Sequence, residues 1–186
     1  MKLTRPDLHI ISFDVPYPAN YGGVIDVFYK LKSLYNLGLK VSLHCFDYGR
    51  GKPAELEKYC SEIYYYKRSL SLTQQFDSIP FIVKTRINEE LIKNLIRDDR
   101  PIIFEGLHTC GIIKDQRITS RLKLIRMHNI EHLYYKGLAS VETNLIKKTY
   151  FQLEAQKLEK YEPIISKADK ILAISKSDAD HFKKFN

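Results

Sequence analysis

Residues 121–132 read RLKLIRMHNIEH, and the fold of this stretch decides both the architecture and the place of its histidines. Between residues 122 and 127 the side chains fall into two alternating sets, one of Leu122, Leu124 and Arg126 and one of Lys123, Ile125 and Met127. This period of two is that of a β-strand. We therefore predict a strand that ends at Met127 and places His128 at its carboxyl end. Asn129 is a favourable N-cap for the helix that follows.

The same stretch carries the HxxEH spacing of an inverted zinc-peptidase motif at residues 128–132. In that motif the two imidazoles lie on one face of a single helix. Because the predicted strand ends just before His128 and the helix begins after it, His128 and His132 would not share a helical face. A zinc site also needs a third ligand. The remaining histidines show no paired spacing with these two: His9, His44, His108 and His181. We therefore expect no metal site and a partly exposed His132, and a zinc hydrolase remains the less favoured alternative.

Short apolar or β-branched runs recur along the chain and predict five further strands, at 8–13, 40–46, 62–66, 101–105 and 170–175. Helical patterns lie between them, at 22–37, 53–60, 88–98, 129–139 and about 143–167. This alternation is typical of βαβ crossovers. We predict an α/β fold with a doubly wound, mainly parallel, Rossmann-like sheet and helices on both faces.

Two segments carry more specific expectations. Residues 69–87 are the least regular part of the chain, for which we expect a short helix and a mobile loop near the ligand cleft. The long helix has apolar residues at helical spacing, and we expect it to pack against the sheet. These residues are Ile146, Tyr150, Leu153, Leu158, Tyr161 and Ile165.

The length of 186 residues indicates one domain, spanning 1–186. The N-terminus fits neither a secretory signal nor a spanning helix, and no stretch reaches about 18 apolar residues. Cys45, Cys60 and Cys110 are an odd number without a recognisable pair spacing, so we expect reduced thiols that act as packing residues. The expected location is cytoplasmic.

The formal net charge of +8 favours anionic partners, such as phosphorylated small molecules, an acidic membrane surface or nucleic acid. The densest lysine pairs, at 147–148 and 183–184, sit on helical patterns where a solvated face is the simpler interpretation. No nucleic-acid recognition motif is visible, so we do not expect nucleic-acid binding.

In doubly wound folds ligands bind outside the carboxyl ends of the strands, which makes His128 a candidate site residue. The other candidate is the pair Gly22-Gly23, which leads into a helix after a loop rich in proline. Two glycines there permit close backbone approach and leave N–H groups at a helix N-terminus, which suits contact with a diphosphate or hydroxyl. A flexible turn explains the pair equally well.

Known nucleotide fingerprints are absent from the chain. The loop before Gly22 is too long for a tight dinucleotide turn, and neither GxGxxG nor GxxxxGK[ST] occurs. A dehydrogenase and a nucleoside triphosphatase are therefore disfavoured, and we expect no cofactor.

The order and spacing of several short motifs resemble the start of group 1 glycosyltransferases with the GT-B fold. A first strand is followed by a P-x-P element, a glycine pair that opens a helix, and an L-x3-G-x-x-V element: Pro16, Pro18, Gly22, Gly23, Leu34, Gly38 and Val41. HNIEHLYYKGLA at 128–139 and ADKILAISKSD at 168–178 are also similar to that family. The resemblance covers essentially the whole chain.

This resemblance implies the N-terminal, acceptor-side domain of a retaining hexosyltransferase of polysaccharide biosynthesis. The partners would be a nucleotide-diphosphate sugar, a glycan or lipid-linked acceptor, and the protein's own C-terminal domain. Relatives place a histidine at the end of the fifth strand against the donor sugar, and His128 occupies that position. The resemblance therefore implies that His128 is the catalytic residue and that no divalent ion is needed.

Further substrate-binding residues are predicted around the same cleft: Tyr21, Gly22, Gly23, Glu105, His108, Asn129, Glu131 and Ser175. Alternatives exist for several of them. Glu105 could instead cap a loop, and His108 could be a surface histidine. Glu131 could serve only to complement the N-terminus of its helix, and Ser175 could serve only to cap the final helix. Tyrosines at 64–66 and 134–135 suit sugar stacking, although core packing is the more common role of such clusters.

The chain ends at Asn186, before the second Rossmann domain through which the family binds its nucleotide, so we expect a truncated chain that is inactive alone. Val24 also departs from the small residue and glutamate that follow the glycine pair in many relatives. A weaker hypothesis is peripheral contact with an anionic membrane at its inner face, through lysines of the long helix. A stand-alone flavodoxin-like binding module is the alternative function. The sequence specifies neither donor sugar, acceptor, linkage nor oligomeric state.

Overall fold

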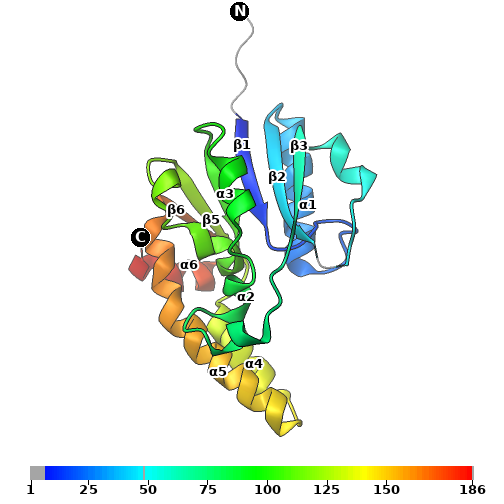
Figure 1. The fold of residues 1–186 in the computed structure, drawn as a ribbon. Coiled ribbons are helices and arrows are strands. Elements are labelled where there is room, and N and C mark those ends of the chain that lie inside the picture. The colour runs from blue at the N-terminus through cyan, green and yellow to red at the C-terminus, as the bar shows by residue number, and fades with distance from the viewer. Residues whose placement is uncertain (1–6, 48, 186) are drawn as a thin grey trace, which may run out of the picture.

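The computed structural model describes residues 7–47 and 49–185, and its centre is a six-stranded, all-parallel sheet of order β3-β2-β1-β4-β5-β6 (Figure 1). The strands are β1 (Asp7–Ser12), β2 (Lys40–Asp47), β3 (Glu62–Lys67), β4 (Ile102–Glu105), β5 (Lys123–Met127) and β6 (Lys170–Ala173). The six predicted strands are confirmed, with small differences at their ends. The stretch that ends at Met127 is a strand, as its period of two indicates.

Helices cover both faces of the sheet and bury two separate apolar clusters. The α-helices are α1 (Gly22–Asn36), α2 (Phe81–Lys84), α3 (Glu89–Leu95), α4 (Glu131–Val141), α5 (Leu145–Tyr161) and α6 (Lys176–Phe182). Short 3-10 helices are η1 (Ala54–Lys58), η2 (Leu72–Phe76), η3 (Leu107–Ile112), η4 (Gln116–Ile118), η5 (Glu162–Lys167) and η6 (Lys183–Phe185).

Alternate residues of a strand point to opposite faces, and β1 shows this directly. Ile10 packs with Val27 and Leu31 of α1 on one face, whereas Ile11 belongs to the cluster on the other face. That second cluster includes Leu91 of α3 and Leu158 of α5. Helices therefore pack on both faces of β1. The predicted doubly wound, Rossmann-like α/β fold is confirmed.

The strand order reverses between β1 and β4. From β1 the chain moves outward to β2 and β3, then returns to pair β4 with the other side of β1. The connections after β1 and β4 therefore diverge, and they leave a crevice at the carboxyl ends of these strands. His128 directly follows β5, the strand next to β4.

Helices α4 and α5 form a hairpin that extends beyond the sheet (Figure 1). Leu158 is fully buried, whereas Leu153 is 53% and Ile146 is 82% exposed. The expectation that the long helix packs against the sheet is therefore wrong for its first half. That half packs against α4 instead, because the hairpin carries it past the edge of the sheet.

Two smaller predictions need correction. Helix α4 begins at Glu131, and its N-cap is Ile130 without a side-chain cap hydrogen bond, so Asn129 is not the N-cap. Residues 69–87 contain two short helices, η2 and α2, instead of one. Arg86 follows α2 and donates a 2.9 Å hydrogen bond to the carbonyl oxygen of Phe13. This bond ties the segment to the loop after β1.

The described cysteines are free: Cys45 and Cys110 are buried and Cys60 is partly buried. This agrees with their predicted role as reduced packing residues. Among the helices within residues 7–47 and 49–185, none combines the length and apolar character that crossing a membrane requires.

Candidate functional site

A cavity of about 730 Å³ lies where strands β1, β4 and β5 end and helices α1 and α4 begin. This is the crevice that the reversal of strand order creates. Seven of the nine residues predicted as site residues line it: Tyr21, Gly22, Gly23, His108, His128, Asn129 and Glu131. The structure thus brings together side chains that lie more than one hundred residues apart in the sequence.

The glycine pair forms the beginning of α1 at the wall of this cavity. Tyr21 is the N-cap, and its side chain makes no cap hydrogen bond. A Cβ atom on Gly23 would lie 2.6 Å from the ring of Phe13, so the helix reaches this position only because residue 23 has no side chain. A Cβ atom on Gly22 would meet nothing within 4 Å. Gly23 is thus explained by packing, and Gly22 faces open space.

His128 is 8% exposed and lies against a buried carboxylate. Its Nε2 atom is 3.0 Å from Oε2 of Glu105, which has no exposed surface. A carboxylate oxygen accepts hydrogen bonds, so Nε2 of His128 is the donor in this contact, and Nδ1 on the other side of the ring lies 3.7 Å from Oδ2 of Asp26. The contact with Glu105 holds the orientation of the ring at the cavity wall.

Lys30 of α1 donates a 2.6 Å hydrogen bond to Oε1 of Glu105, so both carboxylate oxygens are occupied. Lys30 also contacts Asp26 at 3.1 Å, and Arg126 of β5 holds the same Asp26 through two hydrogen bonds of 3.1 and 3.2 Å. Two basic side chains, Lys30 and Arg126, therefore pair with the two carboxylates that lie next to the ring of His128. Burial alone would raise the pKa of Asp26, but the bonds from Arg126 and the charge of Lys30 lower it.

Gly106 permits the close approach of His108 to the end of β4. It follows β4 with a φ of 72°, in the left-handed region that glycine tolerates. A Cβ atom there would lie 3.0 Å from Nδ1 of His108 and 3.6 Å from Cδ2 of His128. The absence of a side chain at residue 106 therefore makes room for His108, whereas the distance to His128 is an ordinary van der Waals contact.

His108 and Glu131 line the cavity, and each has a buried polar atom without a hydrogen-bond partner among the described residues. Nδ1 of His108 and Oε1 of Glu131 are 3.8 Å apart, and neither makes a hydrogen bond to a described residue. Burial raises the pKa of Glu131 to about 7. Burial, then the charges of Arg86 and His128, hold the pKa of His108 well below its ordinary value. Unsatisfied buried polar atoms at a cavity are suited to bind a polar ligand.

Two predicted substrate-binding residues are not brought to the cavity wall. Glu105 lies behind His128 and positions it. Ser175 is exposed and caps α6, where it accepts a hydrogen bond from the backbone N–H of Asp178 at 3.1 Å. The capping alternative for Ser175 is therefore what its contacts support.

Sequence reasoning missed four residues of the cavity: Phe13, Asp26, Arg126 and Ile174. A signal existed for Arg126, a charged residue within an otherwise mainly apolar strand that leads to His128. Asp26 and Lys30 stand four residues apart on α1, which is ion-pair spacing. The tyrosines at 134 and 135 were noted, and Tyr134 is 52% exposed at the cavity, as sugar stacking requires.

The histidines of the HxxEH motif lie in different clusters. His128 is grouped with Asp26 and Glu105, whereas His132 is grouped with Glu162 and His181. The zinc-hydrolase arrangement, with both imidazoles on one metal, is therefore wrong. The expectation of a partly exposed His132 is also wrong, because it is only 6% exposed. Burial lowers the pKa of its imidazole.

The chain matches no protein-family model. It is 33% identical over 184 residues to an "Uncharacterized 44.6 kDa protein in cps region" of Klebsiella pneumoniae. The match covers 94% of this chain and 47% of that relative, so the chain spans about half the length of the protein it resembles.

Proposed function

We propose that this chain is the acceptor-side domain of a retaining glycosyltransferase, which moves a sugar from a nucleotide-diphosphate donor to a hydroxyl of a glycan or lipid-linked acceptor. The observation that carries the proposal is the cavity at the strand-order reversal. It places an oriented imidazole, His128, next to two unpartnered polar atoms on His108 and Glu131. A site for a molecule with many hydroxyl groups needs such fixed polar groups.

In this proposal His128 contacts the donor sugar. Retaining transfer without a protein nucleophile depends on a dry, preorganised site that stabilises the charge of the departing diphosphate. The bond to Glu105 holds the imidazole before substrate arrives, so no binding energy is needed to orient it. The N-terminus of α1, which lacks a side-chain cap, supplies N–H groups for the diphosphate.

The acceptor would bind at His108 and Glu131. A carboxyl whose pKa is about 7 is partly protonated at neutral pH, so it can donate a hydrogen bond to one hydroxyl oxygen or accept one from a hydroxyl proton. Tyr134 and Tyr135 offer aromatic faces for the apolar side of a sugar ring.

The similarity to a protein in a cps region supports the proposed role in polysaccharide biosynthesis. The length of that protein also suits the proposal that a second domain, of roughly 150 to 200 residues, binds the nucleotide in the complete protein.

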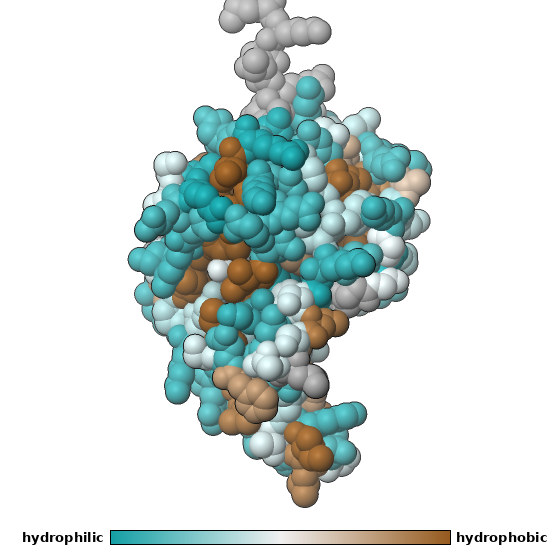
Figure 2. All heavy atoms as spheres, in the orientation of Figure 1, coloured by the Kyte–Doolittle hydropathy of each residue, from teal (hydrophilic) through white to brown (hydrophobic). Residues whose placement is uncertain are grey.

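Contact with an anionic membrane belongs to the same proposal, since it would bring a lipid-linked acceptor to the cavity. Hydrophobic side chains gather at the end of the α4–α5 hairpin (Figure 2). Val141 and Leu145 are each 77% exposed there, and Ile146 is 82% exposed. Lys147 and Lys148 follow directly on α5. Exposed apolar residues beside lysines are typical of a helix that rests on an acidic lipid surface.

The full-length protein tests the proposed function. It is incubated with a panel of nucleotide-diphosphate sugars, and release of nucleoside diphosphate is measured with and without glycan or lipid-linked acceptors. We expect one donor to be consumed, with the anomeric configuration retained in the product. Failure of every donor to bind, measured by calorimetry on the same protein, would instead favour a binding module of the flavodoxin type.

A further inference from the structure

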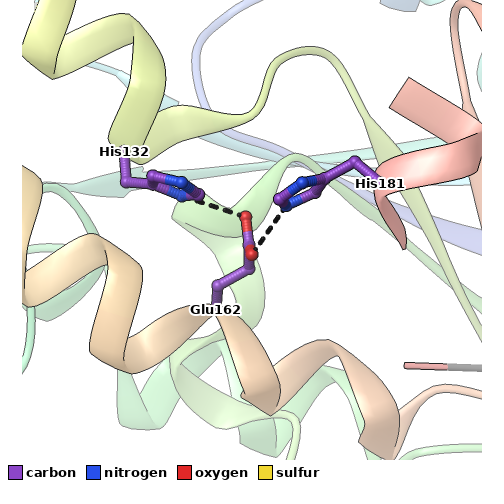
Figure 3. Close-up of side chains that lie close together, drawn as sticks. All are labelled: His132, Glu162 and His181. Atoms are coloured by element: carbon purple, nitrogen blue, oxygen red, sulfur yellow. Dashed lines mark hydrogen bonds and ion pairs between the residues drawn. The ribbon is translucent and has the colours of Figure 1, made fainter. Parts of the chain in front are cut away.

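A second polar cluster lies away from the cavity, at the place where three helical segments meet. His132 is in the first turn of α4, Glu162 begins η5, and His181 is in the last turn of α6 (Figure 3). None of the three lines the cavity described above. Figure 3 shows both imidazoles directed at the carboxylate of Glu162, one from each side.

The distances within this cluster are close to those around a bound cation. Nδ1 of His132 is 3.2 Å from Oε1 of Glu162, and Nε2 of His181 is 2.8 Å from Oε2 of the same residue. The ligand atoms all lie within 4.8 Å of one another. Zinc bonds of about 2.0–2.1 Å in a tetrahedron place ligand atoms about 3.3 Å apart, so small side-chain rotations are sufficient to close this set around an ion.

One contact of the cluster is not a satisfied hydrogen bond. Nδ1 of His132 and Oε1 of Glu162 are both buried, and neither has a hydrogen-bond partner among the described residues although they are only 3.2 Å apart. The side chains of His132 and Glu162 are 7% and 3% exposed. A buried imidazole nitrogen and a buried carboxylate oxygen that face each other without a hydrogen bond are suited to share a metal ion, and burial makes their unsatisfied state costly.

We propose that His132, Glu162 and His181 bind a zinc ion. Two imidazoles and one carboxylate form a set that zinc accepts, with water at the fourth position, whereas magnesium and calcium prefer oxygen ligands throughout. The side chain of His181 is 20% exposed, and it gives the ion a path from solvent. The zinc would hold α6 against α4 and the end of α5, and this proposal is independent of the function proposed for the cavity.

The other histidine–carboxylate cluster does not share this character. Asp26 and Glu105 are already paired with Lys30 and Arg126, so His128 sits in a network whose negative charge is balanced by permanent cations. At Glu162 the nearby permanent cation is Lys184, whose Nζ is 3.7 Å from Oε2. Its side chain is 55% exposed and free to turn into solvent when a metal takes its place.

The test begins with the intact protein, stripped with a chelator and dialysed. Titration with zinc chloride is followed by calorimetry, and thermal unfolding is recorded with zinc chloride or magnesium chloride. We expect one zinc ion per chain and a higher Tm with zinc, because a ligand that binds only the folded state stabilises it. Magnesium should leave Tm unchanged. Absence of zinc uptake by the native protein would overturn the proposal.

Two variants identify the ligands. His181→Ala should bind zinc at least about 100-fold more weakly, since a lost ligand costs more than a lost supporting contact. His128→Ala is the matched control: it removes the other histidine of the HxxEH motif and should bind zinc as the native protein does. Loss of zinc binding in His128→Ala, or unchanged binding in His181→Ala, would contradict the assignment.

A third variant keeps the proposal testable where His181→Ala fails to fold. Lys184→Ala removes a cation that competes for Glu162 and should bind zinc more tightly than the native protein. Weaker zinc binding in Lys184→Ala would contradict the assignment, because it would show that the lysine supports the bound state.

Discussion

The Nε2 atom of His128 lies 3.0 Å from a carboxylate oxygen of Glu105, a residue that contributes no surface to solvent. Because Glu105 does not line the cavity, its effect on substrate passes through the orientation of the histidine. Glu105 is therefore a positioning residue, and its role is separable from that of His128.

Replacement of Glu105 by Gln tests this relationship. An amide keeps the shape of the side chain but weakens the bond to His128 and leaves Lys30 without its closest carboxylate. We expect kcat of the full-length enzyme to fall by about 10–100-fold with KM nearly unchanged. A rise in KM alone would place Glu105 in substrate binding, and equal kinetics would remove its positioning role.

Gly106 gives a prediction about stability. A side chain at a φ of 72° is strained, and in Gly106→Ala the new Cβ would also press on His108. We expect urea unfolding to show a decrease of about 1–3 kcal/mol in the free energy of unfolding, since a φ of 72° with a ψ of 165° is a conformation almost restricted to glycine. Gly137→Ala is the control, because residue 137 is exposed in the interior of α4 and a Cβ there meets nothing within 4 Å. The free energy of unfolding of Gly137→Ala should rise by about 0.5–1 kcal/mol. Equal effects of the two changes would contradict the strain at Gly106.

Glu131 predicts how stability depends on pH. Its pKa is raised from 4.5 to about 7 in the folded chain, so the fold binds a proton that the unfolded chain releases. The stability that this proton contributes is complete below about pH 4.5 and is lost as the pH rises through about 7. Glu131→Gln removes this titration. The free energy of unfolding of the variant, relative to that of the native chain, should therefore rise by about 2–4 kcal/mol between about pH 5 and pH 8.

Urea unfolding of both proteins at the two pH values measures this difference. Glu159→Gln is the control, because Glu159 lies on the exposed side of α5 where its contact with Lys136 is open to solvent. A stability difference between native and Glu131→Gln chains that stays constant with pH would show that the carboxyl is ionised throughout the range.

The α4–α5 hairpin predicts preference for acidic lipid. Full-length protein should co-sediment with vesicles that contain an acidic lipid and much less with neutral vesicles, since lysines contribute about 1 kcal/mol each near an anionic surface. A double change, Lys147→Glu with Lys148→Glu, should abolish the preference, whereas the single change Lys93→Glu on α3, outside the hairpin, should retain it. Equal binding to both kinds of vesicle would reject the membrane contact.

The sheet was predictable because its signal is local. The period of two from residue 122 to 127 is set by neighbours in the chain, and it placed His128 at a strand end. The general rule for doubly wound folds then located the cavity without any knowledge of side-chain contacts. The same local patterns also identified the helix that starts at Gly22.

Contacts that join distant parts of the chain were not predictable in the same way. Asp26 and Arg126 are one hundred residues apart, and only the completed fold brings their side chains within hydrogen-bonding distance. His132, Glu162 and His181 meet because the α4–α5 hairpin folds back and α6 closes against its base, and no spacing in the sequence records that meeting. The same hairpin is why Ile146, despite helical spacing with Leu153, lies in solvent.

The central claim is that His128 acts on a donor sugar in the cavity at the end of β5. The most direct measurement is the turnover of nucleotide-diphosphate sugar by full-length His128→Ala, with Ser175→Ala, an exposed helix cap outside the cavity, as the control. The account predicts that His128→Ala loses turnover by about 100-fold or more while its unfolding curve stays close to that of the native protein, and that Ser175→Ala retains turnover. Native turnover in a folded His128→Ala variant would contradict it.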